Sequence, residues 1–486
     1  MWNNVADISK TDYRLFYGFG VVVLLSIITA VATGFYYMAG LPALLLLVWF
    51  TILDFRKPFF LLLACLPLST EIYLPNGFGT DLPSEPLMLG LAGVYLLYAF
   101  RHPRSLDGRF FRHPITLLLL LHIGWIVVTT ITSSLFFVSF KFLLAKIWYV
   151  LPFYFLAGLL LRRPSDVRQY FWWVFIPLLG TIFYALAKHS AYGFSFEFVH
   201  KAFHPFYRNH VNYAAIIALF VPFIWFVRQW YPRYSLRWLL LAGALLLMLV
   251  AIQLSYTRAA YVAIFIAMGS YFIIRWRLMR VAVAGALVGA IVLVALLAVN
   301  NRYLDYAPNF DRTITHTDFN NLIEATYQLE DISTMERVYR WIAGFYMSKD
   351  KPVVGFGPGN FYNFYWPYTV TSFQTYVSDN PEKSGIHSYY LMTLVEQGYT
   401  GLFLFLLMLF YVLIRGERIY YETRGRQHKQ VVMIALLMII VISGLQIIND
   451  LLEVDKVGPF FFMAMAILVN ADLQNRAFSD ENQVVD

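Results

Sequence analysis

Charged residues and cysteine are both scarce in this chain of 486 residues. Charged side chains make up 14% of the sequence, whereas soluble domains contain about 25%, and apolar residues make up 59%. A soluble globule cannot bury that much apolar surface, so the composition excludes a cytosolic enzyme, a secreted disulfide scaffold and a disordered protein. Cys65 is the single cysteine, so no internal disulfide can form. Because no nucleotide, zinc or haem signature occurs, we predict neither a metal site nor a cofactor.

Apolar runs that are long enough to cross a bilayer recur along the chain. About 20 helical residues span the hydrocarbon core. We predict spans near residues 15–33, 36–53, 58–74, 84–100, 114–135, 142–161, 170–188, 211–228, 237–254, 259–274, 281–299, 388–414, 430–448 and 457–472. The first run follows no basic stretch or cleavage site, so we expect a retained span rather than a signal peptide. The sequence therefore predicts an all-α polytopic integral membrane protein with about 12–14 transmembrane helices in a phospholipid bilayer.

The positions of the basic residues indicate an orientation. If the N-terminus is cytoplasmic, most of the 37 Lys and Arg residues fall in cytoplasmic segments and few fall in the short outer links. Such an asymmetry is the main determinant of membrane orientation, so we predict that both termini are cytoplasmic. Topology thus accounts for the net charge of +8, and we do not expect nucleic acid as a partner.

One long segment divides the spans into two groups. We predict transmembrane helices 1–11 in residues 1–299, a periplasmic loop domain with short helices in 300–386, and the last three helices with a cytoplasmic tail in 387–486. Within the loop, Ser333 to Glu336 forms a capping box and is followed by apolar residues at helical spacing. This pattern predicts an amphipathic helix over residues 334–348.

Glycine is concentrated in residues 352–360, Pro-Val-Val-Gly-Phe-Gly-Pro-Gly-Asn. A phosphate-binding loop would need a following Gly-Lys-Ser/Thr and a strand-to-helix setting, and both are missing. We therefore predict a structured turn. Glu396 lies nine residues after His387, on the opposite face of the expected helix, and we expect it to pack against another helix or an inside pathway.

Cations at the predicted outer surface are the most informative residues. Arg208, Arg258 and Lys146 fall at or just inside the outer ends of spans. A charge inside the bilayer costs about 2.5–3.5 kcal/mol, so cations kept there indicate a function, with snorkelling to the headgroups as the alternative. His387 opens a later span at the same depth.

Arginine and histidine at an outer membrane surface suit one kind of chemistry. The arginine fork matches phosphate oxygens and keeps its charge at any relevant pH. Histidine exchanges a proton near neutral pH. We therefore predict that a lipid diphosphate sugar binds there, that the arginines stabilise the leaving diphosphate, and that His387 activates an acceptor hydroxyl without a metal.

Residues 205–405 resemble the bacterial O-antigen ligase and O-antigen polymerase family. The resemblance is carried, in order, by Arg208-Asn-His-Val-Asn-Tyr, Ser255-Tyr-Thr-Arg258, Glu336-Arg337 with Trp341, Pro352-Val-Val-Gly-Phe-Gly-Pro-Gly-Asn-Phe361, and His387-Ser-Tyr-Tyr-Leu followed by Glu396-Gln-Gly398. The segments occur together in a polytopic chain with a large outer loop before the late histidine, which is a fairly specific combination.

The resemblance implies a metal-independent glycosyltransferase of the bacterial inner membrane, active on the periplasmic face in lipopolysaccharide biosynthesis. Its donor would be glycan linked to undecaprenyl diphosphate. His387 would be the catalytic histidine, and Arg208, Arg258 and Arg337 would contact the donor diphosphate. Lys146, Arg340, His210, Asn212 and Tyr390 are possible further contacts.

The acceptor remains open at this point. We favour ligation to lipid A-core over polymerisation onto a lipid-linked repeat, and relatives also transfer glycan to protein. A flippase for lipid-linked oligosaccharide is an alternative of another class, but the large outer segment and the lack of a visible repeat disfavour it. A polymerase of the peptidoglycan shape-and-division type would rely on an outer-loop carboxylate such as Asp379 or Glu382.

Overall fold

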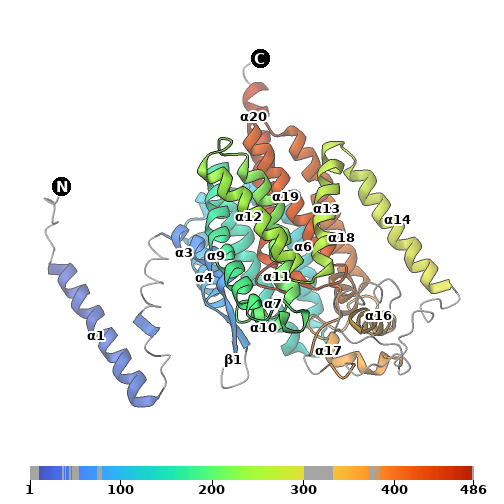
Figure 1. The fold of residues 1–486 in the computed structure, drawn as a ribbon, viewed down its shortest axis with the longest axis horizontal. Helices are drawn as coiled ribbons and strands as arrows, with labels where there is room; N and C mark the ends of the chain where they lie inside the picture. The colour runs from blue at the N-terminus through green and yellow to red at the C-terminus, as the bar shows by residue number, and fades with distance from the viewer. Residues whose placement is uncertain are drawn as a thin grey trace.

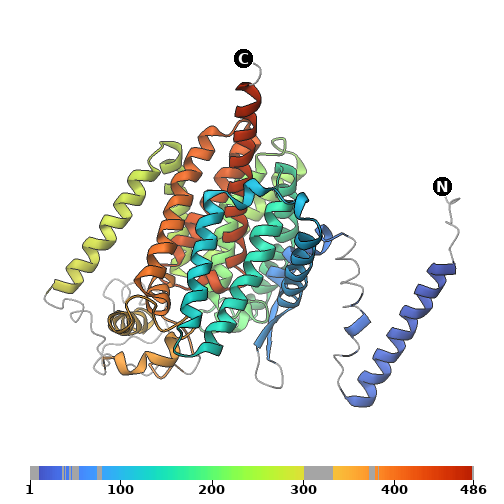
Figure 2. The ribbon, with the colours of Figure 1, turned by 180° about the vertical axis from the view of Figure 1, so that it is seen from behind.

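The computed structural model describes residues 10–34, 38, 40–42, 45, 54–73, 79–299, 332–370, 378–380 and 383–483. The helices are α1 (Lys10–Thr33), α3 (Arg56–Leu68), α4 (Ser84–Arg101), α5 (Gly108–Phe111), α6 (Pro114–Ile131), α7 (Phe136–Val150), α8 (Ala157–Leu160), α9 (Pro164–Ser190), α10 (Val199–Phe203), α11 (His210–Arg228), α12 (Leu236–Gln253), α13 (Arg258–Arg275), α14 (Met279–Ala298), α16 (Ile332–Asp350), α17 (Phe361–Phe364), α18 (Tyr389–Glu422), α19 (Arg426–Leu445) and α20 (Gly458–Gln483). One antiparallel hairpin joins β1 (Thr70–Tyr73) to β2 (Gly79–Leu82). Most of the long helices form a bundle of roughly parallel and antiparallel rods, and α1 lies apart from it (Figures 1 and 2).

Nine segments in the described part of the chain are long and apolar enough to cross a membrane. They are α6, the continuous Phe136–Leu160 segment from α7 to α8, α9, α11, α12, α13, α14, α18 and α19. The predicted runs at 15–33, 84–100 and 457–472 are also helical, as α1, α4 and α20. Most of the predicted run 36–53 lies outside the described residues. The prediction of an all-α polytopic membrane protein is confirmed.

The predicted span 58–74 is wrong in its second half. Helix α3 ends at Leu68, directly after Pro67, and the chain turns into β1. Thr70 pairs with Leu82 and Tyr73 pairs with Gly79 across the hairpin. Proline cannot donate to a helical hydrogen bond, and the Thr-Glu-Ile-Tyr sequence of β1 is rich in residues that favour a strand. The apolar pattern alone did not distinguish this strand from a continued helix.

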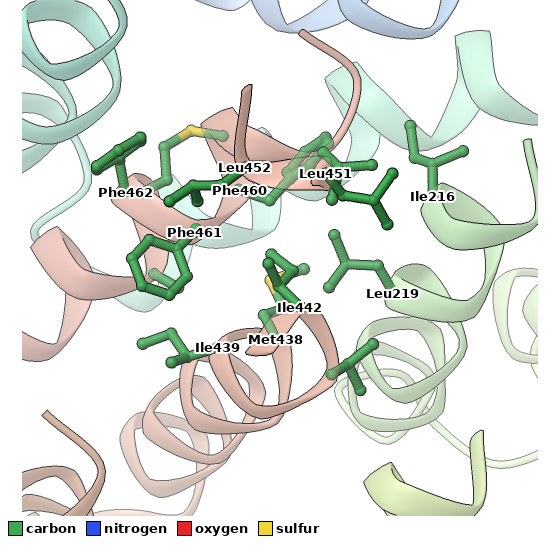
Figure 3. Close-up of a cluster of buried hydrophobic side chains, with 14 of the residues drawn as sticks. Ile216, Leu219, Met438, Ile439, Ile442, Leu451, Leu452, Phe460, Phe461 and Phe462 are labelled. Carbon is green, nitrogen blue, oxygen red and sulfur yellow. The ribbon is translucent and has the colours of Figure 1, made fainter. Parts of the chain in front are cut away.

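The centre of the bundle is formed by α11, α19 and α20. Every residue from Tyr213 to Phe220 on α11 and from Val431 to Ile439 on α19 is buried. Figure 3 shows aliphatic side chains of these two helices meeting Phe460, Phe461 and other side chains at the start of α20. By contrast, no described residue of α14 after Met279 is buried. Apolar residues therefore occupy both the core of the bundle and its outer surface, as expected when lipid surrounds the protein.

The two ends of the bundle differ (Figures 1 and 2). At one end lie α16, α17, α10 and the hairpin, together with the starts of α11, α13 and α18 and the end of α19; we call it the loop end. The opposite end carries the last turns of α20 and the basic links 101–113, 161–163, 229–235, 276–278 and 423–425; we call it the basic end.

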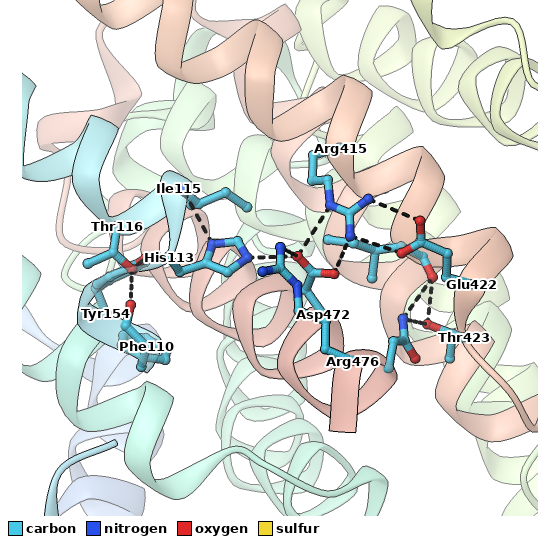
Figure 4. A network of polar contacts seen from close by, with 12 residues as sticks. Phe110, His113, Ile115, Thr116, Tyr154, Arg415, Glu422, Thr423, Asp472 and Arg476 are labelled. Atoms are coloured by element: carbon cyan, nitrogen blue, oxygen red, sulfur yellow. Dashed lines mark hydrogen bonds and ion pairs between the residues drawn. The ribbon is translucent and has the colours of Figure 1, made fainter. Parts of the chain in front are cut away.

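A buried ionic network ties three helices together at the basic end (Figure 4). Asp472 of α20 accepts from Arg415 of α18 through Oδ1 at 2.5 Å, and its Oδ2 lies 2.8 Å from His113 Nε2 just before α6. Arg476, one turn later on α20, donates to the same carboxylate at 3.1 Å. Because the Asp472 side chain is fully buried, its charge is matched by cations rather than by water.

Candidate functional site

Helix α16 confirms the predicted amphipathic helix and lies across the loop end against α18 (Figure 1). Arg340 is buried on this helix and donates to Glu336 at 3.2 Å, to Ser384 Oγ at 2.9 Å and to the carbonyl of Gly385 at 3.3 Å. Trp341 Nε1 donates to the carbonyl of Ile386 at 3.0 Å. Thus α16 fixes the backbone of residues 384–386, immediately before His387.

His387 is held from both sides. Its backbone is left-handed, with φ of +56°, a conformation that non-glycine residues adopt rarely. After it, the amide of Tyr389 donates to the carbonyls of Gln446 (3.0 Å) and Asn449 (3.1 Å) at the end of α19. Burial, reinforced by the positive charges of Arg337 and Arg340, lowers the pKa of His387 to about 3. The imidazole is therefore neutral at pH 7 and beside two cations.

Arg337 lies one turn before Trp341 on α16. Its Nε donates to the carbonyl of Ile448 at 3.3 Å, which fixes the guanidinium beside the link between α19 and α20. Together with its effect on the pKa of His387, this contact places Arg337 at the predicted centre.

Asp450 is a member of the site that the sequence analysis missed. A Cβ atom on Gly385 would lie 2.8 Å from Asp450 Oδ2, so the carboxylate packs directly under the backbone two residues before His387. Burial raises the pKa of Asp450, and the charges of Arg340 and Arg208 oppose that rise. Both guanidinium groups therefore lie within electrostatic range of this carboxylate, which links Arg208 to the surroundings of His387.

Arg208 and Arg258 stand at the starts of two adjacent helices. Asn209 caps α11 by accepting from the amide of Asn212 at 2.9 Å, and Arg208 directly precedes this cap with an exposed side chain. Arg258 is the first residue of α13 and is half-buried. Thr257 Oγ1 donates to the carbonyl of His210 at 3.2 Å, so the two segments are joined at the loop end.

Lys146 lies deeper than the sequence analysis predicted. Because α7 begins at Phe136 rather than near residue 142, Lys146 is about 15 Å along the helix from its outer end. The side chain is 4% exposed, and Nζ donates to Glu453 Oε1 at 2.5 Å. A lysine buried with a carboxylate does not snorkel to the headgroups, so that alternative is wrong for Lys146.

Three further residues were predicted as possible contacts to the donor, and each lies in different surroundings. The Tyr390 hydroxyl donates to the carbonyl of Ser443 at 2.9 Å, toward α19. The ring of His210 meets that of His200, with centroids 4.7 Å apart. Asn212 is half-buried in the first turn of α11. Their predicted roles as donor contacts stay predictions.

The link between α19 and α20, residues 446–457, carries four charged residues, which together contact three different parts of the fold. Beyond Asp450 and Glu453, Asp455 accepts from Ser69 Oγ at 2.8 Å and from Ser84 Oγ at 3.3 Å. Lys456 Nζ donates to the carbonyl of Ser69 at 2.8 Å. A charge-dense stretch between two apolar runs was the available signal, but its partners are 65 to almost 390 residues away in sequence.

The glycine-rich segment forms the predicted structured turn and docks on a break in α18. Gly355, Gly357 and Gly359 all have positive φ. The amide of Gly359 donates to Glu396 Oε2 at 2.8 Å, and that of Phe361 donates to Glu396 Oε1 at 3.1 Å. The prediction that Glu396 packs against another helix is confirmed in part: its carboxylate accepts from the first amide of α17, and it also accepts from the glycine-rich turn. These amides donate to a carboxylate of the protein itself, not to a phosphate.

Within the described residues, no group of three or more His, Cys, Asp and Glu side chains is arranged to hold a metal ion.

Fold and site together define a class of protein: a polytopic membrane protein whose loop end gathers arginines around a neutral histidine. Residues 243–406 match the family described as O-Antigen ligase. The match runs from α12 into α18 and includes Arg258, Arg337 and His387, and it confirms the resemblance found in the sequence. No curated protein matches the chain. The family supports glycan transfer of the ligase or polymerase type, with lipid-linked substrates in a membrane setting.

Proposed function

We propose that the protein transfers a glycan from undecaprenyl diphosphate to an acceptor hydroxyl at the loop end, and that the acceptor is lipid A-core. The observation that carries this proposal is the setting of His387, whose imidazole is kept neutral by burial and by the positive charges of Arg337 and Arg340, which lower its pKa. An anion that binds among those arginines changes the imidazole's affinity for a proton, and a donor diphosphate is such an anion.

The reaction would proceed as an attack of the acceptor on the sugar. His387 takes the proton of the acceptor hydroxyl, its oxygen bonds to the anomeric carbon, and the bond from that carbon to the diphosphate oxygen breaks. Arg208, Arg258 and Arg337 stabilise the charge that develops on undecaprenyl diphosphate as it leaves. The two negative charges of the donor offset the arginines and raise the pKa of His387, so the base becomes effective only when donor is bound.

In this proposal, Arg340 and Asp450 are positioning residues that hold the segment before His387. Arg340 uses its guanidinium on Glu336, Ser384 and Gly385, so it holds the His387 segment rather than the donor. Asp450 supports the same segment from beneath and keeps Arg208 near it. Small displacements of a reacting group cost large factors in rate, which gives such contacts their importance.

The finer features of the proposal rest on the sequence pattern and the family. They are the metal-independent reaction, the bacterial inner membrane, the cytoplasmic termini and the periplasmic active site. A polymerase that joins lipid-linked repeats would use the same chemistry, and only the acceptor would differ. A flippase is less well supported, because Arg208, Arg258 and Arg337 lie at one end of the bundle instead of at its midplane.

The test is a surface-glycan gel from the native host, which compares wild type with a chromosomal His387→Ala variant, with lipid-linked glycan extracted in parallel. We expect a loss of transfer of about 10²–10⁴-fold, the range for removal of a general base. Loss of all attached chains, with long glycan accumulating on lipid, identifies a ligase. Lipid A-core with a single repeat identifies a polymerase instead.

His204→Ala is the matched control, because His204 is an exposed histidine at the same end of the bundle. It should leave the glycan ladder unchanged. Equal amounts of both variants in the membrane, with equal unfolding midpoints in detergent, separate catalysis from folding. An unchanged ladder for His387→Ala would refute the catalytic assignment and reopen the transporter.

A further inference from the structure

A pocket lies at the basic end, away from His387. It has a volume of about 340 Å³ and is enclosed by the link before α9, the link between α18 and α19, and the last half of α20. Its rim carries Arg162, Arg163, Arg424 and His428, all of them exposed. Its wall includes Val167, Val431 and Ile467, all of them buried. A cationic rim above an apolar wall matches an amphiphile with an anionic head.

The cations at the rim are available to a ligand. No ion pair in the described ranges joins Arg163 or Arg424 to a carboxylate. The acid nearest to Arg163 in sequence, Asp166, is already paired with Arg56 at 2.8 Å. Helices α9 and α19 both begin at this rim, where Pro164 and Gly425 line the pocket. Their amino termini add positive potential for an anion.

The pocket is part of the fold rather than a gap between loose loops. Asn475 on α20 donates through Nδ2 to Thr423 Oγ1 at 3.1 Å, and both residues line the pocket. Gln474 Nε2 donates to the carbonyl of Arg162 at 2.5 Å across the same space. The Asp472 network of Figure 4 lies next to it and fixes α20 against α18. Its walls are therefore held independently of any ligand.

We infer that this pocket binds the head group of an anionic phospholipid from the leaflet at the basic end, with the start of an acyl chain against the apolar wall. Basic pockets between transmembrane helices at this depth have the chemistry that recognises acidic lipid head groups. Free phosphate offers the same charge but has nothing to place against Val167, Val431 and Ile467. The apolar wall therefore favours the lipid.

The experiment uses the purified full chain in neutral detergent. Binding of dioleoylphosphatidylglycerol is measured by native mass spectrometry, with dioleoylphosphatidylcholine as the uncharged comparison. We expect one phosphatidylglycerol to bind more tightly than the rest, and Arg163→Gln with Arg424→Gln to weaken it by about 30-fold, at roughly fivefold for each basic residue. Arg104→Gln with Arg233→Gln removes two exposed arginines of the same end that do not line the pocket, and should change binding less than twofold.

A second pair of variants tests the apolar wall. Ala471 lines this pocket, and Ala477 on the same helix lines a different one. Ala471→Phe should weaken phosphatidylglycerol by about 10-fold, and Ala477→Phe should not. Equal binding by all variants would overturn the site. Displacement of the tight lipid by 10 mM inorganic phosphate would also overturn it, because a small-anion site would then suffice.

Discussion

The two ends of the bundle use the same residue types for opposite purposes. At the basic end, His113, Arg415 and Arg476 converge on one buried carboxylate, Asp472. At the loop end, the charges that act on the histidine are those of Arg337 and Arg340. At the basic end, the histidine lies 2.8 Å from a carboxylate that two arginines also contact, so the polar groups there are already paired with one another and hold helices together. A histidine beside two arginines is disfavoured as a cation and suits an incoming anion.

Asp472→Asn should produce the largest effect and would break the basic end alone. The change removes the fully buried negative charge that His113, Arg415 and Arg476 share; Arg415 keeps Glu422, whereas the buried His113 loses its carboxylate partner. We expect a loss of about 3–5 kcal/mol of stability, seen as a lower unfolding midpoint in detergent. Transfer per folded molecule should stay within about twofold of wild type.

The control for this change is Asp54→Asn, since Asp54 is an exposed carboxylate 3.9 Å from Lys57. It should cost less than about 1 kcal/mol. A wild-type midpoint for Asp472→Asn, combined with lost transfer, would reverse the roles that we assign to the two ends.

Gly398→Ala should weaken the loop end through the backbone. Gly398 has φ of +72° and ψ of −177°, a region that residues with a side chain avoid. A Cβ atom there would also lie 2.7 Å from the carbonyl oxygen of Pro352. We expect a loss of about 2–3 kcal/mol and faster proteolysis of residues 352–361. Gly243→Ala, in α12 with open space around its Cβ, should be neutral or slightly stabilising.

Asp450→Asn sharpens the comparison at the loop end. The carboxylate under Gly385 becomes neutral, so Arg208 and Arg340 are no longer drawn toward it. We expect kcat to fall about 10–100-fold through misplacement of His387 while the KM for the donor does not rise, because the cations remain. A rise in KM with unchanged kcat would instead make Asp450 part of donor binding.

Arg337→Gln should give the smallest but most specific effect. Arg337 helps to lower the pKa of His387, so its removal raises that pKa toward the ordinary value of about 6.5. In the donor-free wild-type protein, His387 becomes protonated only near pH 3; in the variant, the acidic limb of the pH profile of kcat/KM, which reports the free enzyme, moves to higher pH. Arg208→Gln should lower the rate without moving that limb. The profile distinguishes a charge effect from simple loss of a donor contact.

The lowered pKa of His387 should also make the free energy of unfolding depend on pH. His387 binds its proton less readily in the folded state than in the unfolded state, where its pKa is about 6.5. Unfolding therefore takes up a proton between pH 6.5 and 3, and this group lowers stability as pH falls through that window. At pH 7 and above it has no such effect.

The sequence by itself determined the fold class, and it supplied the predictions for the residues that act at the loop end. Runs of about 20 apolar residues have few alternatives to a membrane helix, so the prediction of a polytopic bundle was confirmed. The capping box and apolar spacing of α16 are local signals, and they were sufficient. Arg337 and His387 were identified by residue type and order, and the structure places them together.

Only the tertiary structure determined which residues far apart in sequence contact each other. Asp450 reaches Gly385 across 65 positions of sequence, and Lys146 meets Glu453 across 307. No local pattern encodes such pairs, because a side chain's partner depends on how helices far apart in sequence pack. The same reason explains why Glu396, read as one face of a straight helix, turned out to receive loop amides next to a break at Gly398.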